Sequence, residues 1–400
     1  MTCCASGTTA SGRKKPDSYG ILPADIHPNR KGGREKPNPC KEPVLPLKKG
    51  SGKQKEEICI MRKMRFGLRL AAAAAALCLA LSGCGSSGAA GNAADGEEQV
   101  FNLTLSHGLA EDHAVHIALT AFAEDVKEQS GGTINIEIFP NGVLGSETDN
   151  ITQIRAGALD MAKVSASTLG NFQNEWNVLS VPYVFNDQEH YYNVMDGDIA
   201  QDLYQLTADK GFMGLTWMDS GARSFYTADR AIRTPADLKG LRIRTMDSQM
   251  AIDMMDALGG SSTVMGYSEI YTGMQQGVVD GAENNVTALR DHADVTKYYC
   301  FDEHTRIPDI LLISSETWNA MSDHQRQIMT DCAKKMTEDY KSAWTEFENE
   351  VLAAAEEKGV ELIRDVDTAA FQEACQSIYT NLETESPEVY AYVERIQAAG

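Results

Sequence analysis

The sequence predicts an α/β protein built as a two-lobed clamp, with a long C-terminal helix that spans both lobes. Three observations lead to this prediction. Apolar strands and amphipathic helical stretches alternate along two separate parts of the chain. About 300 residues follow an N-terminal leader, a length typical of two domains rather than one. An amphipathic stretch near the C-terminus keeps helical spacing for roughly 35 residues, which is too long for one small lobe.

The first 60 residues are rich in Lys, Arg, Pro and Gly and show no sustained apolar period. Such a segment cannot bury enough apolar surface to offset the entropy that it would lose on ordering. We therefore expect residues 1–60 to be a non-native or disordered extension upstream of the protein proper.

A signal peptide is predicted over residues 61–83. It opens with a basic stretch after Met61, and residues 70–81 then form an apolar run of Ala, Leu and one Cys. This run is too short to span a bilayer as a stable helix, but it suits the apolar part of a signal peptide.

The signal run ends in Leu81-Ser82-Gly83-Cys84, which resembles the bacterial lipobox, in which the cysteine is acylated and becomes the new N-terminus. We expect a lipid on Cys84 that anchors the protein to the cell membrane on its extracytoplasmic side. Residues 84–99 are mostly Gly, Ser, Ala and acidic residues, a composition typical of a flexible tether.

The part of the chain after the signal peptide is strongly acidic. The chain has 36 basic and 57 acidic residues, of which residues 1–83 hold 16 and 6. Residues 84–400 therefore carry 20 basic and 51 acidic residues, a net charge of −31. Such a chain is a poor partner for nucleic acid, which is bound by clusters of Lys and Arg. An arginine in a ligand cleft of this protein must have a well-defined position.

The first lobe is expected over residues 100–221. Apolar residues alternate or recur at helical spacing in the order strand, helix, strand, helix, strand, which implies parallel pairing with right-handed crossovers. These segments are 101–105, 115–126, 134–138, 151–158 and 160–164, and a helix over 187–211 and a strand over 212–218 complete the lobe.

The second lobe is expected over residues 222–308. Thr234-Pro235 begins a helix, because Thr is a good N-cap and Pro suits the first helical position. The remaining elements are a strand over 241–245, helices over 248–258 and 268–277, and a strand over 278–283.

The C-terminal part returns to both lobes. Residues 310–313 form a strand that rejoins the first lobe, and Ser322 with Gln325 forms a capping box that starts the long helix. The helix lacks a strict seven-residue repeat, so we expect it to pack across the lobes rather than form a coiled coil. About 309–345 then belongs to the first lobe and about 346–400 to the second.

The motifs of common enzymes are missing from this sequence. It has no Gly-x-Ser-x-Gly elbow, no phosphate-binding Gly-rich loop and no His-Glu-x-x-His, so we expect no enzyme, no cofactor and no metal. We interpret His113 and His116 as side chains that face solvent or lie at the edge of the cleft, rather than as metal ligands. Cys300, Cys332 and Cys375 indicate buried thiols, although a Cys332–Cys375 bridge stays open.

One polar cluster points to carboxylate binding. It consists of Arg223, Arg244 and the pair Asn284-Asn285, and Arg244 shares a strand face with Arg242. Ligands of open α/β lobes gather at the carboxyl ends of strands, where Asn284 and Asn285 are expected. An Arg can hold a carboxylate there through two charge-assisted hydrogen bonds.

Residues 100–375 resemble the extracytoplasmic solute-binding proteins of TRAP transporters, the DctP-like family. The resemblance lies in the order and spacing of short motifs along the chain. They are Phe122-Ala123-Glu124, Ser130-Gly131-Gly132, Pro140-Asn141-Gly142-Val143-Leu144-Gly145, Gly157-Ala158-Leu159-Asp160-Met161, Leu238-Lys239-Gly240-Leu241-Arg242-Ile243-Arg244 and Val279-Asp280-Gly281-Ala282-Glu283-Asn284-Asn285.

The resemblance implies a periplasmic-binding-protein-like clamp that closes over a carboxylate ligand and docks on TRAP membrane subunits. It assigns Arg244 as the carboxylate clamp, Asn284 as its support and Arg223, in Ser220-Gly221-Ala222-Arg223, as a second arginine of the cleft. It also implies that the ring of Tyr267 forms an aromatic wall of the ligand cleft.

Two further positions are carried over from the family. Ser165 matches a position at which the residue type differs between family members that bind different ligands. His113 matches a position at which some members of a subgroup contact the ligand. Both positions come from the resemblance alone.

The resemblance favours a sugar acid, such as a uronate, as the ligand. The double Asn and His304-Thr305-Arg306-Ile307-Pro308 resemble members that bind such acids. Asn284, Asn285 and Glu283 can meet hydroxyl groups beside one carboxylate clamp. A C4-dicarboxylate is the alternative, and Arg223 could then serve as the second cation.

Two other classes of protein stay open. A binding lipoprotein of an ATP-driven importer, for amino acids or metals, would have a different lobe order and no helix bridging the lobes. A glycan-processing enzyme would need two acids facing one cleft, and nothing in this sequence pairs them.

Overall fold

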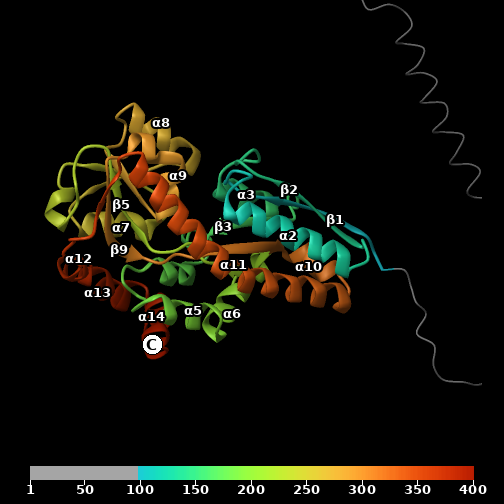
Figure 1. Ribbon diagram of the computed structural model, residues 1–400. Helices are drawn as coiled ribbons and strands as arrows, with labels where there is room; N and C mark the ends of the chain where they lie inside the picture. Colours follow the sequence, from blue (N-terminus) through green and yellow to red (C-terminus); the bar gives the residue numbers. More distant parts are fainter. Residues whose placement is uncertain (1–97) are drawn as a thin grey trace, which may run out of the picture. The chain divides into compact units, whose positions relative to one another are not determined.

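The computed structural model describes residues 98–400 (Figure 1). The extension over 1–60, the signal peptide over 61–83, Cys84 and nearly all of the tether lie outside the described residues. Among the helices of residues 98–400, none is both long and apolar enough to cross a membrane.

The first sheet has five strands in the order β2-β1-β3-β10-β4. The pairs β1–β2 and β1–β3 are parallel, which confirms the predicted strand–helix–strand units. β10 runs antiparallel between β3 and β4, so the chain returns to this sheet after building the second one. The strands are β1 (Phe101–Ser106), β2 (Ile134–Phe139), β3 (Met161–Ser165), β4 (Phe212–Met218) and β10 (Asp309–Ser314), and the crossover helices are α2 (Ala114–Gln129) and α3 (Glu147–Arg155).

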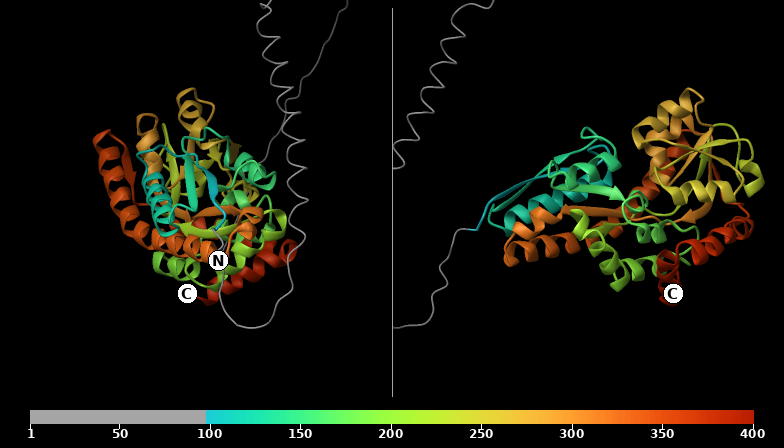
Figure 2. Two further views of the ribbon diagram at one scale, coloured as in Figure 1. Left: turned by 90° about the vertical axis from the view of Figure 1, so that its right-hand side faces the viewer. Right: turned by 180° about the vertical axis from the view of Figure 1, so that it is seen from behind.

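The second sheet has six strands in the order β11-β9-β5-β8-β6-β7. Both sheets are mixed and carry helices, as expected for an α/β fold (Figure 2). The strands are β5 (Arg223–Thr227), β6 (Arg242–Thr245), β7 (Ser261–Val264), β8 (Gly281–Asn284), β9 (Tyr298–Thr305) and β11 (Glu361–Ile363), and the helices are α7 (Gln249–Ala257), α8 (Ile270–Gln275) and α9 (Leu289–His292).

Three expected elements differ in extent. The strand expected over 278–283 begins only at Gly281, because the N–H groups of Val278 and Val279 donate to the carbonyl of Gly273 and finish helix α8. Thr234 caps a short 3-10 turn rather than an α-helix. The helix expected over 187–211 is divided at Gly197 into α5 (Gln188–Met195) and α6 (Asp198–Gln205).

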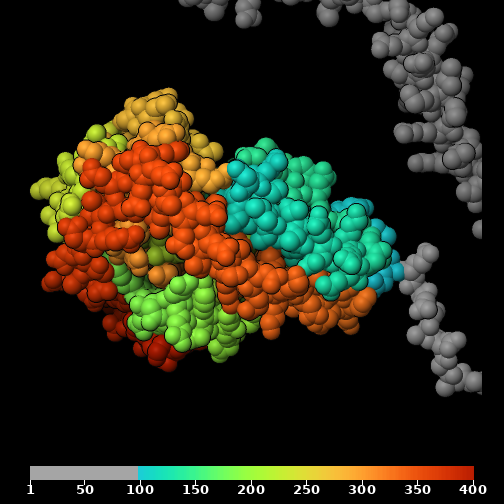
Figure 3. All heavy atoms as spheres, in the orientation of Figure 1, coloured from blue at the N-terminus to red at the C-terminus, as the bar shows by residue number. Residues whose placement is uncertain are grey.

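The long helix α11 (Asp323–Glu357) is continuous over 35 residues and begins at the predicted capping box. Met329 and Cys332 pack in the core of the first sheet. Val351 and Ala355 pack with Tyr226 in a core of the second sheet. Figure 3 shows the helix running past both lobes, which confirms that it spans them.

Residues 346–400 were expected to belong to the second lobe, but not all of the C-terminal helices pack there. α12 (Thr368–Ala374) and α13 (Gln376–Glu385) contact elements of the second lobe, β9 and α7. α14 (Pro387–Ala398) packs instead on residues 174–180 and on α6. The reason is its apolar face, formed by Val389, Val393 and Ile396, which is buried in the same hydrophobic core as Trp176.

The three cysteines of the described chain are free and buried. Cys332 and Cys375 therefore do not form the bridge that the sequence left open. Burial raises the pKa of Cys300 and of Cys375 to about 12. These thiols act as small apolar side chains of the core.

Candidate functional site

A cavity of about 700 Å³ lies between residues of the two lobes. It is bordered by the ends of β3 and β6, by the start of α3 and by the turn that follows β8. Seven of the eight predicted ligand residues line it: His113, Ser165, Arg223, Arg244, Tyr267, Asn284 and Asn285. Glu283 does not border the cavity.

Arg244 is the one arginine at the cavity whose charge has no carboxylate partner among residues 98–400. Its side chain is buried, and its Nε donates to the carbonyl of Met265 at 2.9 Å. Burial lowers the pKa of Arg244, but a guanidinium stays protonated at neutral pH. The two Nη atoms of Arg244 can therefore meet one carboxylate of a ligand.

Arg242 shares the strand with Arg244 but lies outside the cavity. Its guanidinium is half-exposed and pairs with Asp280, with Nη2 and Oδ1 2.7 Å apart. Only one of the two arginines of this strand is therefore placed to bind a ligand.

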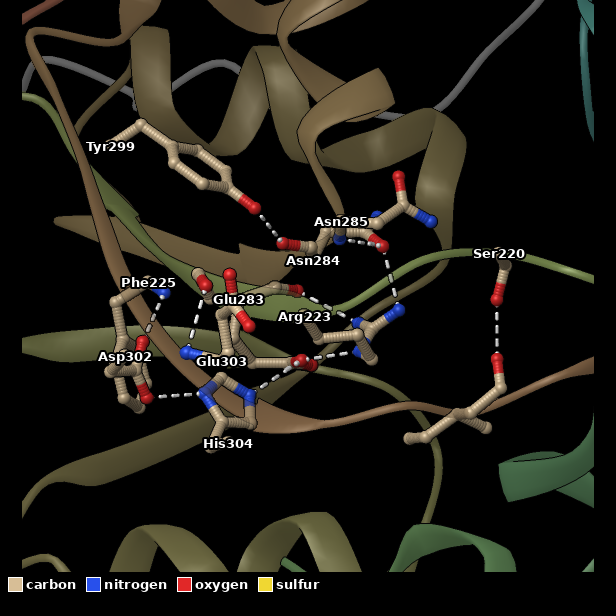
Figure 4. A network of polar contacts seen from close by, with 12 residues as sticks. Ser220, Arg223, Phe225, Glu283, Asn284, Asn285, Tyr299, Asp302, Glu303 and His304 are labelled. Carbon is tan, nitrogen blue, oxygen red and sulfur yellow. Dashed lines mark hydrogen bonds and ion pairs between the residues drawn. The ribbon is translucent and has the colours of Figure 1, made fainter. Parts of the chain in front are cut away.

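Arg223 lines the cavity and also belongs to a buried network of polar side chains (Figure 4). Its Nε donates to Oε2 of Glu283 at 2.7 Å, and its Nη1 donates to Oδ1 of Asn284 at 2.6 Å. His304 joins the same network, with Nε2 3.5 Å from Oε2 of Glu283 and Nδ1 2.6 Å from Oδ2 of Asp302.

The network is electrically balanced. Burial favours the neutral forms, but Arg223 and His304 outweigh it and lower the pKa of Glu283 to about 2. Burial also opposes the charge on His304, but Asp302 and Glu283 raise its pKa to about 9. Two cations and two anions then face one another, so the charge of Arg223 is neutralised inside the protein.

This arrangement changes two sequence-based interpretations. Glu283 was expected to contact the ligand, but successive residues of a strand face opposite sides, so its side chain lies behind the wall that Asn284 helps to form. Arg223 was considered as the second cation for a dicarboxylate. Its pairing with Glu283 removes the excess charge that this role requires.

Three residues that the sequence reasoning missed form the polar wall on the first lobe. Lys163 of β3 is buried, and its Nζ lies 2.9 Å from Oδ2 of Asp309 and 3.7 Å from Oε1 of Glu147. All three line the cavity. The available signal was a lysine inside the apolar strand 161–164, because a buried Lys requires a partner.

The comparisons with known proteins agree with this geometry. Residues 105–385 match the family DctP, described as bacterial extracellular solute-binding protein, family 7. The chain belongs to the DctP family. The resemblance to TRAP solute-binding proteins is thereby confirmed, and with it the solute-binding function and the extracytoplasmic setting of the family.

Among the relatives of this DctP-family chain, the uncharacterized protein YiiZ of Salmonella typhimurium is 42% identical over 286 residues, covering 70% of this chain and 87% of the relative. A TRAP periplasmic solute-binding protein of Anaerococcus prevotii, solved with bound α/β-D-glucuronate, is 32% identical with a TM-score of 0.73, covering 74% and 97% of the two chains. One from Sulfitobacter, with bound β-D-galacturonate, is 33% identical with a TM-score of 0.72, covering 74% and 100%.

The DctP family also includes relatives with other ligands. The C4-dicarboxylate-binding protein DctB of Bacillus subtilis is 29% identical over 246 residues, covering 61% of this chain and 70% of the relative. Family membership alone therefore does not decide whether the ligand is a sugar acid or a C4-dicarboxylate.

The remaining site residues of this DctP-family chain are held by hydrogen bonds. Tyr267 donates from its hydroxyl to Oδ2 of Asp291 at 2.8 Å. Oδ1 of Asn285 accepts from the N–H of Thr287 at 3.1 Å, which leaves its amide NH₂ group as a donor. Internal hydrogen bonds therefore fix the orientation of both side chains.

The two remaining residues lie on the first lobe. Burial lowers the pKa of His113 to about 3, so the ring is neutral. Its Nδ1 accepts from the N–H of Val115 at 3.2 Å, which places the proton on Nε2. Ser165 caps no helix with its hydroxyl, so this group can turn toward a ligand.

Polar contacts join the lobes near the cavity. Oγ1 of Thr148 donates to Oδ2 of Asp247 at 3.1 Å, and Nδ2 of Asn171 donates to the carbonyl of Asp247 at 2.7 Å. Arg290 of α9 forms an ion pair with Asp112. These contacts hold the two walls of the DctP-family site together.

Proposed function

We propose that this protein binds a sugar acid, a hexuronate such as D-glucuronate or D-galacturonate, and delivers it to TRAP membrane subunits. The observation that carries the proposal is Arg244, a buried guanidinium at the cavity with no carboxylate partner among the described residues. A ligand carboxylate there would form two charge-assisted hydrogen bonds.

The rest of the cavity suits a hydroxyl-rich ligand. Its volume of about 700 Å³ lies within the range of small-molecule pockets. Ser165, Asn285 and Lys163 offer donors and acceptors around the space next to Arg244. The related structures with bound glucuronate and galacturonate support the same ligand class.

A C4-dicarboxylate is the second candidate, since a relative is named for binding it. The ion pair of Arg223 with Glu283 argues against it, because a dicarboxylate requires a second cation with unpaired charge.

The proposal extends to the anchor and to the absence of catalysis. A lipid on Cys84 would keep the protein at the outer face of the membrane, which the lipobox Leu81-Ser82-Gly83-Cys84 behind an apolar run supports. The protein binds its ligand without transforming it. The solute-binding character of the family supports this part of the proposal.

Titration calorimetry and thermal shift with D-glucuronate, D-galacturonate, succinate and malate test the function. A bound ligand stabilises the folded state by RT ln(1 + [L]/Kd), so a uronate should raise the melting temperature. Arg244→Ala should weaken uronate binding by about 10-fold to more than 100-fold.

Arg242→Ala is the matched control, because this arginine lies on the same strand outside the cavity and should leave the affinity unchanged. An unchanged affinity in Arg244→Ala would contradict the clamp. A thermal shift with succinate or malate alone would contradict the ligand class.

A further inference from the structure

We propose that Lys163, Asp309 and Glu147 make the site selective for acids with a single carboxylate, by binding the hydroxyl groups of the ligand and repelling a second carboxylate. The inference rests on the proposed function, because it concerns the same cavity and the end of the ligand that lies away from Arg244.

The three side chains come from separate elements and meet at one wall. Lys163 lies in β3, Asp309 begins β10 and Glu147 begins α3. Their side chains are 6%, 11% and 29% exposed. Oε2 of Glu147 also accepts from Oγ1 of Thr168 at 2.8 Å, which fixes the orientation of the carboxylate.

The wall carries a net negative charge. Burial works against the ammonium of Lys163, but Asp309 and Glu147 outweigh burial and raise its pKa, so the lysine is charged. One ammonium between two carboxylates leaves a charge of −1. A second ligand carboxylate beside this wall would be repelled, and the repulsion is strong where little water reaches the charges.

The other charged groups at the cavity do not offset this charge. Arg223 is neutralised by Glu283, and His113 is neutral. The exposed charged residues of the lining are the acids Asp149, Asp247 and Glu269. Arg244 is then the single cation with unpaired charge at the cavity in the described chain, and it balances one carboxylate only.

Hydroxyl groups suit the same wall. A carboxylate accepts from a hydroxyl, and the ammonium of Lys163 has N–H groups beyond the one given to Asp309. A uronate clamped by its carboxylate at Arg244 would direct ring hydroxyls toward the first lobe. Its aldarate, in which the aldehyde carbon is also oxidised to a carboxylate, would direct an anion there instead.

Titration calorimetry with D-glucuronate and with its aldarate, D-glucarate, measures how strongly the site selects against a second carboxylate. The wild-type protein should bind glucuronate at least about 10-fold more tightly than glucarate, as expected for an unpaired charge in a desolvated site. Glu147→Gln, which keeps the shape and removes one negative charge, should narrow this ratio by about 10-fold through tighter glucarate binding.

Glu128→Gln is the control, because this exposed carboxylate on α2 does not border the cavity and should leave the ratio unchanged. Equal binding of the two acids by the wild type, or an unchanged ratio in Glu147→Gln, would overturn the inference while uronate binding stood. A wild-type protein that binds no uronate would overturn the proposed function itself.

Discussion

Replacing Glu283 by Gln tests the buried network behind the ligand cavity. The change keeps the shape of the side chain but removes the anion that faces two cations. Nε of Arg223 lies 2.7 Å from Oε2 of Glu283, and Nε2 of His304 lies 3.5 Å from the same atom. Asp302 would be left as the one carboxylate of the network.

Two independent arguments give a similar loss of folding stability for Glu283→Gln. Removing one partner of a buried ion pair costs about 3–5 kcal/mol, because the other charge stays buried. The pKa of Glu283 is about 2 instead of 4.5, which corresponds to about 3 kcal/mol. We therefore expect Glu283→Gln to lower the free energy of unfolding by about 3 kcal/mol at pH 7.

The effect should depend on pH in one direction. A carboxyl whose pKa is lowered by folding contributes stability above its unfolded pKa and loses it as the pH falls through the folded value. The difference between wild type and Glu283→Gln should therefore shrink as the pH falls from 4.5 toward about 2. Urea unfolding at several pH values measures it.

Asp280→Asn is the control for this experiment. Asp280 pairs with Arg242 at the same distance of 2.7 Å, but the pair is exposed to solvent. The substitution Asp280→Asn should therefore change the free energy of unfolding by less than about 1 kcal/mol. If Glu283→Gln has an effect as small as that of Asp280→Asn, the buried pair does not stabilise the fold as argued.

Two further predictions concern Glu348 of α11 and the ion pair between Asp112 and Arg290. Burial, with Asp219 nearby, raises the pKa of Glu348 to about 7, so the wild type loses stability as the pH rises through 7. Thermal unfolding should show Glu348→Gln to be more stable than the wild type at pH 8, by about 3 kcal/mol, and equal to the wild type below about pH 4.5. Asp112→Asn removes the ion pair with Arg290 across the lobes, and stopped-flow kinetics should show uronate dissociating roughly two- to fivefold faster. An unchanged dissociation rate would show that this pair does not hold the lobes closed.

The sequence predicted those parts of the fold and site that have a local signal. The alternation of apolar residues in 101–105 and 134–138 follows from the period of a strand with one buried face, and both strands are present. The capping box at Ser322 placed the start of α11 to the residue. The position of Arg244 at the cavity could be predicted because the residue stands inside a recognisable motif.

The parts that were missed depend on contacts between distant residues. Lys163 and Asp309 are 146 residues apart in sequence, so no local pattern joins them. Glu283 was assigned to the ligand together with Asn284 and Asn285, but successive side chains of β8 face opposite sides, so Glu283 and Asn284 cannot both face the cavity. Which of the two faces it depends on how β8 packs against distant elements, and no local pattern reveals that.

The order in which the two sheets are completed has a consequence for biosynthesis. The interior strand β10 of the first sheet follows the second lobe in the chain, and α11 supplies apolar residues to both cores. A nascent chain that ends before residue 309 therefore lacks part of each core, so neither lobe can fold to completion until most of the chain has been made. Late completion of both cores delays the folded state, which suits export of an extracytoplasmic family member through a narrow channel.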